Sequence, residues 1–343
     1  MQRLVAAARR PPPRACARRS LTGAAAAAAA VATAAAVAPP ACCDGSSDGE
    51  LEECDVLVVG GGVVGLSTAY HLARRGKRVL LCNAGHSVRG SWGESRAAHL
   101  AQTDSVRLRM ARRGIGWYKR LEQETGISFL IHSERLNIGP LSAIDNLCNS
   151  YLAHDVAHTR LSPSEVDSRW ERRVQLAPEE QAVLISDGWT VLASEALRAL
   201  ASAAEAEGAV LVDGEAVVSI DANKQLVRTD SGRVVRYHQA MVLAAGAWTN
   251  QLLRLADLPL LPIAVTEEQT VQFAMRPASS TGNTLASLPL ITHTDPAKQE
   301  YFYCVPPVDR PGCLAGCKVG FHQRGMHMCS TVPHSVRFEF TKA

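Results

Sequence analysis

The sequence predicts an α/β fold that begins with two parallel strands. Three observations lead to this prediction. An apolar strand from Asp55 to Gly60 runs directly into a glycine-rich turn. Apolar residues at helical spacing follow the turn, and a second apolar strand covers Arg78 to Cys82. Because parallel strands need a crossover connection, usually a helix, this order predicts a strand–helix–strand unit of the Rossmann type.

The turn has the spacing G-x-G-x-x-G, formed by Gly60, Gly62 and Gly65. In this pattern the first glycine makes the turn, the second lets the backbone approach a pyrophosphate, and the third lets the helix pack on the strand. The helix N-terminus, at Val63 and Val64, presents free N–H groups to the phosphates. The turn and its flanking elements therefore predict dinucleotide binding. The alternative is a glycine-rich turn in an unrelated α/β domain.

The charge of the chain is unevenly distributed. Residues 1–43 hold six arginines of the 36 Lys and Arg residues, and none of the 33 Asp and Glu residues. The remainder has a net charge of about −3 (30 basic against 33 acidic residues), which argues against nucleic-acid binding by the folded part. At 343 residues the chain has room for two domains.

The arginine-rich, acid-free N-terminus is typical of an organelle transit peptide. We therefore expect residues 1–50 to be a targeting or disordered segment, addressed to a mitochondrion or plastid. A cleaved secretory signal or a plain disordered tail is the alternative, and a peroxisomal or cytoplasmic location stays open. The alanine-rich run 23–38 is shorter than the ~20 apolar residues of a spanning helix, so we expect no integral membrane segment.

The ten cysteines are scattered along the chain, and only Cys313 and Cys317 lie close together. Free buried thiols are expected, since neither a zinc site nor a disulfide framework fits these spacings. No metal site is predicted.

Local patterns predict the elements beyond the first unit. Helices are expected at Ser105–Glu124, Ser162–Arg173 and Ser194–Glu207, the last with Ser194 as its cap. Strands are expected at Phe129–Ile138, Ala209–Val212 and Ala216–Ile220, and a hairpin at Val227–Thr229 and Val234–Tyr237.

The run from Gln239 to Trp248 is apolar and contains Ala-Gly-Ala near its end. A buried parallel strand that ends at a glycine fits a sheet whose carboxyl ends face a cofactor. Together with the first motif, this segment favours FAD over NAD, because flavoproteins of this build return to the nucleotide domain after an inserted substrate region. A core strand that simply turns into a helix is the alternative.

With these segments in order, the chain resembles the flavin-dependent amine oxidase family of monomeric sarcosine oxidase and pipecolate oxidase, within the D-amino-acid-oxidase-like superfamily. Five motifs between Asp55 and about Gly325 carry the resemblance: the glycine fingerprint, RGSWGESRAAH, ETGISFL with ERLNIGP, VLAAGAW, and YFYCVP with CLAGCKVGFH. The resemblance implies an α/β fold, with a Rossmann-type FAD-binding domain and an inserted α+β substrate domain built on a mixed sheet.

The resemblance also implies an activity and its residues. A monomeric enzyme would oxidise a secondary amine, such as sarcosine or pipecolate, to an imine and reduce oxygen to hydrogen peroxide. Tyr303 matches the residue over the substrate face of the flavin, and Lys318 the one on the face where oxygen reacts. His322 would shape the electrostatic field of the active site, and Arg96 would stabilise the reduced flavin. Without the resemblance, Lys318 fits a surface lysine, His322 a core histidine, and Arg96 a structural ion-pair residue.

Further FAD contacts are implied beyond the glycine turn. They fall on Asn83, Ser91, Ser95, Arg96, Val217, Ala245, Gly246 and Trp248. Tyr303 and His99 are the implied substrate contacts.

The sequence departs from the family in four places. Asn83 stands where the family has Asp or Glu for the ribose, and Trp92 replaces a His near the flavin. His99 occupies the position of an Arg that clamps the substrate carboxylate, but a His cannot make the bidentate fork, which puts an amino-acid substrate in question. After Gly325 the chain diverges and lacks the flavin-bonding cysteine; Cys329 lacks the family context. We therefore expect FAD to be held non-covalently. We also expect the sequence to come from a truncated gene model.

The expected domains follow from the resemblance. Residues 54–137 and 190–256 would form the FAD-binding domain, with its C-terminal part missing; 138–189 and 257–325 would form the substrate domain, followed by a divergent tail at 326–343. Two other functions stay open at this point. One is an inactive FAD-binding remnant, and the other is a NAD-linked dehydrogenase, which Asn83 slightly disfavours.

Overall fold

The computed structural model describes residues 51–85, 90–91, 93–274, 288–297, 300–308, 316–321 and 326–327. Several predictions lie outside the described residues: the targeting segment 1–50, Trp92, Cys313, His322, Cys329 and most of the tail. Among the helices described, none combines the length and the apolar character that crossing a membrane requires.

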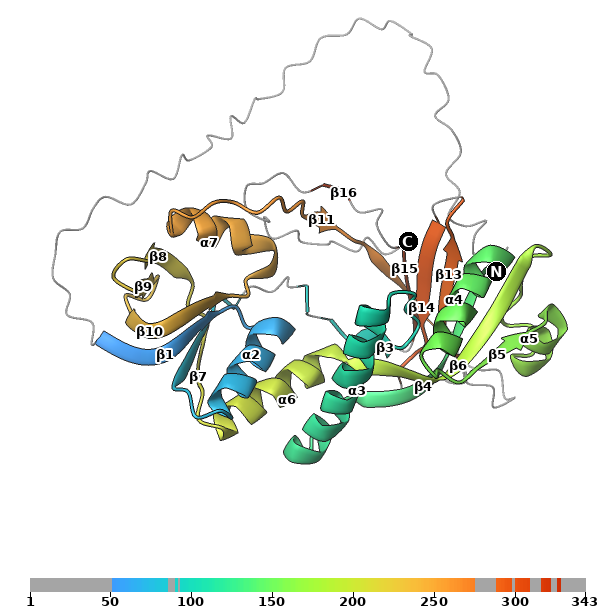
Figure 1. The fold of residues 1–343 in the computed structure, drawn as a ribbon, viewed down its shortest axis with the longest axis horizontal. Helices are drawn as coiled ribbons and strands as arrows, with labels where there is room; N and C mark the ends of the chain where they lie inside the picture. The colour runs from blue at the N-terminus through green and yellow to red at the C-terminus, as the bar shows by residue number, and fades with distance from the viewer. Residues whose placement is uncertain are drawn as a thin grey trace, which may run out of the picture. The chain divides into compact units, whose positions relative to one another are not determined.

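A six-stranded sheet holds the glycine-rich turn, in the order β7-β2-β1-β10-β9-β8 (Figure 1). β1 pairs in parallel with both β2 and β10, and β2 in parallel with β7, whereas β8, β9 and the start of β10 are antiparallel. This confirms the parallel unit and the hairpin. The strands are β1 (Leu51–Val59), β2 (Val79–Asn83), β7 (Val210–Asp213), β8 (Val217–Asp221), β9 (Leu226–Thr229) and β10 (Val234–Leu243).

Helices cover both faces of this sheet. Val56 and Val58 of β1 pack into an apolar cluster with α2 (Val63–Ala73) and α6 (Ala193–Ala206). Leu57 and Val59 point the other way, into a cluster that contains Leu252 of α7 (Thr249–Leu255). All four strand residues are at most 6% exposed. The continuous apolar run of β1 is therefore explained by burial on both sides, as expected for a central parallel strand.

The strand predicted at the start of Gln239–Trp248 differs from expectation. It is the second half of one long strand, β10, whose first half forms the hairpin with β9. Its parallel pairing with β1 is confirmed. However, residues 238–240 are exposed and 241–245 only partly covered, so the prediction of a buried strand is wrong. The apolar clusters centre on β1 and β2, and α7 packs on β8 instead of on this half of β10.

The predicted cap of α6 is also wrong. The helix starts at Ala193, its N-cap residue is Leu192, and no side chain caps it. The chain enters α6 directly from a strand, and the Ala193 N–H donates to the Glu94 carbonyl at 3.2 Å. A backbone carbonyl thus satisfies one of the N–H groups that a cap would otherwise take. The Ser194 hydroxyl donates to the Gly93 carbonyl instead.

A second, mixed sheet follows the order β12-β15-β14-β13-β4-β6-β3, and β5 pairs with β6 (Figure 1). Among the pairings of its described residues, only that of β13 with β4 is parallel. The strands are β3 (Ser95–His99), β4 (Leu130–Pro140), β5 (His158–Leu161), β6 (Glu180–Leu192), β12 (Thr270–Ala274), β13 (Leu290–Asp295), β14 (Glu300–Val305) and β15 (Gly316–Phe321). β11 (Thr266–Glu267) and β16 (Met326–His327) form a separate pair. The predicted α/β class with a mixed second sheet is confirmed.

Helices α3 (Ser105–Thr125) and α4 (Leu141–Ala153) pack on this second sheet, and the short η1 (Gly246–Trp248) precedes α7. Asp104 caps α3 by accepting from the Arg107 N–H, and Gly126 ends it with φ 68°. α5 (Pro163–Arg169) is shorter than predicted and starts at a capping box of Ser162 and Glu165. β3 and β4 join the second sheet, and the division of the chain into cofactor and substrate domains stays a prediction.

Candidate functional site

The glycine-rich turn connects β1 to α2, and at two of its positions a side chain would collide with backbone atoms. Gly60 has φ +118°, and a Cβ there would lie 2.4 Å from the carbonyl oxygen of Ala244. A Cβ on Gly65 would lie 1.8 Å from the carbonyl oxygen of Gly60. These contacts give the two glycines the structural roles predicted for them, namely the turn and the close approach of helix to strand.

The N-terminus of α2 lies beside the segment that contains Ser91. The Val63 N–H donates to Ser91 Oγ at 3.1 Å, and a Cβ on Gly62 would lie 3.2 Å from that oxygen. Gly62 is the N-cap residue, has no capping side chain, and no acidic residue occupies the first turn. A helix start of this kind, with no carboxylate nearby in sequence, suits a negatively charged phosphate. The Val64 side chain is 63% exposed.

Asn83, at the end of β2, connects the turn to a neighbouring carboxylate. Its Oδ1 accepts from the Gly61 N–H at 3.2 Å, and its Nδ2 donates to Asp213 at the end of β7. A Cβ on Gly61 would lie 2.6 Å from Asn83 Cγ. Sequence reasoning missed both Gly61 and Asp213. The signal for Asp213 was its place at the end of the strand after α6, at the same sheet edge as Asn83.

The end of β10 completes this edge of the first sheet. The Ala244 N–H donates to the Val59 carbonyl at 2.8 Å, so Ala245 and Gly246 follow directly beside the glycine turn. Trp248 ends η1 and is partly buried. Val217 is buried in the apolar cluster on the α7 side of the sheet.

Two cations of the predicted site meet at one backbone oxygen. Lys318, on β15, is only 8% exposed, and its Nζ donates to the carbonyl oxygen of Ser95. Arg96 Nη1 donates to the same oxygen at 2.9 Å, and Arg96 Nη2 donates to the Gly90 carbonyl at 3.1 Å. Burial and the neighbouring Arg96 charge lower the pKa of Lys318 to about 8, against the opposing effect of Glu94. The structure thus brings Lys318, Arg96 and Ser95 together.

Tyr303 belongs to the same cluster. It pairs with Gly320 across β14 and β15, and a Cβ on Gly320 would lie 2.6 Å from Tyr303 Oη. The phenol therefore lies across Gly320, where any larger residue would displace it. Burial raises the pKa of Tyr303, the Arg96 charge opposes this shift, and Glu268 adds to it. Lys318 and Gly320 are two residues apart on β15 and therefore lie on the same face of the sheet. Because Tyr303 pairs with Gly320, the lysine and the phenol share that face.

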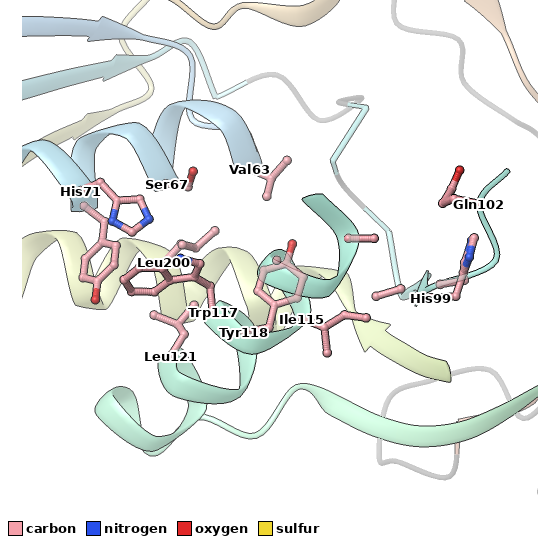
Figure 2. Close-up of a pocket in the computed structure, with 15 residues that line it drawn as sticks. Val63, Ser67, His71, His99, Gln102, Ile115, Trp117, Tyr118, Leu121 and Leu200 are labelled. Atoms are coloured by element: carbon pink, nitrogen blue, oxygen red, sulfur yellow. The ribbon is translucent and has the colours of Figure 1, made fainter. Parts of the chain in front are cut away.

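His99 lies away from this cluster, at the end of β3. Its Nδ1 accepts from the Ala101 N–H at 3.1 Å, so Nε2 carries the proton when the ring is neutral. His99 and Val63 line one pocket of about 440 Å³ between α2, α3, α6 and β3 (Figure 2). Its other lining residues are Ser67, Tyr70, His71, Ala97, Ala98, Gln102, Ala111, Gly114, Ile115, Trp117, Tyr118, Leu121 and Leu200. Lys318, Arg96 and Tyr303 do not line this pocket.

These features define an α/β protein with two sheets, the first with a glycine-rich turn between strand and helix and the second with a cluster of a buried lysine, Lys318, and the half-buried Arg96 and Tyr303. A sequence profile of the FAD dependent oxidoreductase (DAO) family matches residues 55–328, and the chain belongs to this family. The membership confirms the resemblance that the motifs predicted.

Curated relatives include peroxisomal sarcosine oxidases. The human protein is 34% identical over 208 residues, which are 58% of this chain and 52% of the relative. The mouse protein is 28% identical over 271 residues, 77% of this chain and 67% of the relative. The matched part of this chain thus spans about half the length of the human relative.

Solved structures show the same fold. NikD, an amino acid oxidase of nikkomycin biosynthesis, superposes in its open form with a TM-score of 0.63 at 24% identity, covering 81% of this chain and 71% of NikD. L-proline dehydrogenase from P. horikoshii superposes with a TM-score of 0.64 at 19% identity, covering 83% of this chain and 74% of the dehydrogenase.

Proposed function

We propose that this chain binds FAD and oxidises a secondary amine, such as sarcosine or pipecolate, to an imine. In the balanced reaction the amine loses a hydride from its α-carbon and a proton from its nitrogen, and oxygen takes up both as hydrogen peroxide. FAD supplies this redox chemistry when bound, and the protein supplies binding, orientation and charge. The observation that carries the proposal is the pair of cations beside Tyr303, buried Lys318 and half-buried Arg96, which donate to one carbonyl oxygen.

The first sheet supports FAD binding through its carboxyl edge. Gly62, Val63 and Ser91 would hold the pyrophosphate, because the helix start there has neither a side-chain cap nor an acidic residue. Asn83 alone is a weak ribose ligand, but its amide is hydrogen-bonded to the Asp213 carboxylate. The edge therefore contains the carboxylate that the Asn83 position lacks, and Asn83 with Asp213 would bind the adenosine ribose.

The second sheet supports the redox role. Lys318 and Arg96 would place fixed positive charge where negative charge develops on the reduced flavin and on oxygen. Preorganised charges of this kind are strongest where water is excluded, and Lys318 is buried. Tyr303 would face the substrate, and His322 would contribute to the electrostatic field of the active site. The role of His322 stays a prediction, since it lies outside the described residues.

The visible absorbance spectrum of the purified protein tests the proposal, followed by bleaching of the flavin bands on anaerobic addition of sarcosine or pipecolate. We expect flavin bands and bleaching. Flavin bands without bleaching by any secondary amine would favour an inactive FAD-binding remnant. A protein that lacks flavin and binds NAD would overturn the proposal.

We propose that FAD is held without a covalent bond. Cys54 and Cys82 are buried, which raises the pKa of their thiols to about 11 and about 12. Cys304 and Cys317 are hydrogen-bonded to each other, and strand alternation points them away from the face of Tyr303 and Lys318. Acid precipitation is therefore expected to release all flavin into the supernatant. Colour in the pellet that disappears in a Cys304→Ser or Cys317→Ser variant would contradict this expectation.

We also propose that the protein is a monomer and that its partners are a small amine and oxygen. Nucleic acid is not among the proposed partners. The predicted mitochondrial or plastid address rests on residues 1–50. The mammalian relatives are named peroxisomal, which keeps the peroxisome as the alternative location.

A further inference from the structure

Two free cysteines of adjacent strands meet on the face of the second sheet opposite to Tyr303. Cys304, on β14, pairs with Val319 of β15, and Cys317 lies two residues before Val319. Side chains two residues apart in a strand point to the same face, so the two cysteines are diagonal neighbours across the strand pair. The Cys304 thiol donates a hydrogen bond to the Cys317 sulfur. The two sulfur atoms are therefore already in contact.

Solvent reaches this face of the sheet. Cys304 and Cys317 are both partly exposed. On the other side of β15, Phe273 of β12 pairs with Cys317 and is 45% exposed, although phenylalanine is among the residues most often buried. Its neighbour on the same face, Val271, is 54% exposed. A small polar molecule can therefore approach the two thiols from solvent.

The pair also divides the roles of nucleophile and proton holder. The hydrogen bond lowers the pKa of Cys317, which accepts it, against the opposing effect of burial. The same bond raises the pKa of Cys304, which keeps its proton, and burial adds to this shift. The thiolate is the reactive form of cysteine, so Cys317 is the nucleophile and Cys304 is its neutral partner.

The other cysteines in the described part of the chain are less accessible and less reactive. Cys54, Cys82 and Cys148 are at most 3% exposed. Burial raises the pKa of each of these thiols. An oxidant in solution should therefore react with the pair on β14 and β15 before it reacts with these three.

We propose that Cys304 and Cys317 form a peroxide-reactive dithiol, which hydrogen peroxide converts to a disulfide between β14 and β15. The Cys317 sulfur attacks one oxygen of the peroxide, the O–O bond breaks, and the released hydroxide takes up a proton to form water. The Cys304 sulfur then attacks the sulfenic acid of Cys317, the S–O bond breaks, and a second water leaves. Two thiols are thus oxidised to one disulfide while one peroxide is reduced to two waters.

The site goes beyond the proposed amine oxidation. Hydrogen peroxide is the product of that proposed reaction, but the thiols would react in the same way with peroxide from any source. The modified residues are the chain neighbours of two candidate active-site residues, since Cys304 follows Tyr303 and Cys317 precedes Lys318. The disulfide would therefore join the two strands at the point where they position the candidate site.

The diagonal placement of the pair makes the bond reversible. Diagonal neighbours in a sheet lie about 7–8 Å apart, whereas the Cα atoms of a disulfide are usually at most about 6.8 Å apart. Closing the bond therefore draws β14 and β15 together by on the order of 1 Å. A disulfide formed at the edge of its geometric range, in a partly exposed place, is easily reduced. We expect dithiothreitol to restore both thiols.

The first test adds hydrogen peroxide to the reduced full-length chain, in the absence of any amine, and maps disulfides by mass spectrometry. Digestion with Asp-N and chymotrypsin separates the three cysteines of this region, because it cuts at Asp309 and Leu314. We expect a bond between Cys304 and Cys317 that dithiothreitol removes. A bond from either residue to Cys313, or oxidation to sulfinic acid without a disulfide, would overturn the proposal. Since no amine is present, the result is independent of the proposed function.

The second test assigns the two roles with single variants and dimedone, which labels sulfenic acids. In Cys304→Ser the serine hydroxyl still donates to Cys317, but no thiol resolves the sulfenic acid, so Cys317 should be labelled. In Cys317→Ser the thiol of Cys304 should be labelled at least about 10-fold more slowly, because it has lost the low-pKa partner. Equal rates in the two variants would refute the assignment of Cys317 as the nucleophile.

Cys148→Ala is the matched control. Cys148 is a buried thiol of α4 and lies outside the pair, so its removal should leave the disulfide and its rate of formation unchanged. In the wild-type protein, oxidation of Cys148 at the same rate as Cys317 would show general thiol oxidation and would argue against a dedicated site.

Discussion

The Gly62→Val variant is expected to lose FAD while it keeps most of its fold. A Cβ added to Gly62 would lie 3.2 Å from Ser91 Oγ, the acceptor of the Val63 N–H. The two methyl groups of valine would extend into the space over the helix N-terminus, where the pyrophosphate would approach the backbone. Because the α2–sheet contact is made at Gly65 and not at Gly62, the packing of the helix should survive. Flavin content per protein after gel filtration, together with far-UV circular dichroism, measures the two effects.

Gly116→Ala is the matched control for this experiment. Gly116 lies within α3, and nothing is within 4 Å of a Cβ built on it. Alanine is favoured over glycine in a helix by about 1 kcal/mol, so the control should retain FAD and be no less stable. Gly65→Ala marks the other extreme, since its methyl group would meet the Gly60 carbonyl and disturb the helix itself. Full flavin content in Gly62→Val would remove the main support for dinucleotide binding at this turn.

The elements that the sequence predicts well are those whose signals are local. β1, α2 and β2 follow from apolar periodicity and the glycine spacing, and α3 follows from its apolar face and ends at Gly126. The hairpin of β9 and β10 follows from the turn residues between two apolar runs. In each case the deciding interactions lie within a few residues of one another.

The features that the sequence does not reveal depend on partners distant in the chain. Ser194 looks like a helix cap, but a carbonyl about one hundred residues earlier, that of Glu94, takes over part of the role. The run beginning at Gln239 looks buried, but its burial depends on which helices reach β10. Sequence alone gives no register between strands, so it cannot show that Asn83 meets Asp213.

The candidate site divides in the same way. The resemblance named Lys318, Arg96 and Tyr303, and the structure groups them around the Ser95 carbonyl and Gly320.

Lys318→Met is expected to slow the oxygen half-reaction far more than the amine half-reaction. Negative charge develops on oxygen next to the site only in the oxygen half-reaction, and Lys318 with Arg96 supplies the fixed positive charge there. Removal of one such preorganised donor typically costs about 2.7–4 kcal/mol, or roughly 10²–10³ in rate. Anaerobic reduction and subsequent mixing with oxygen in a stopped-flow instrument measure the two half-reactions separately.

The pKa of Lys318 sets the pH dependence of this effect. Burial lowers it from 10.5 to about 8, so the side chain is charged below pH 8 and loses its proton as the pH rises through that value. The wild-type oxygen half-reaction should therefore slow above about pH 8, and Lys318→Met should show no such step. The pH dependence of the free energy of unfolding has the opposite sign to that of the oxygen half-reaction. Between the folded pKa of about 8 and the unfolded value of 10.5 the unfolded chain binds more protons, so wild-type stability should rise with pH in that window.

Lys119→Met is the matched control for Lys318→Met. Lys119 stacks on the Trp189 ring at 4.4 Å, and it donates to none of the residues in the Lys318 cluster. Its replacement removes the same charge and should leave both half-reactions unchanged. An equal loss in both half-reactions of Lys318→Met would make Lys318 a structural residue that holds the Ser95 carbonyl in place. No loss in either would place Lys318 outside the site. A loss confined to the oxygen half-reaction, with a wild-type rate that falls as the pH rises through about 8, would assign the ammonium charge to the oxygen step.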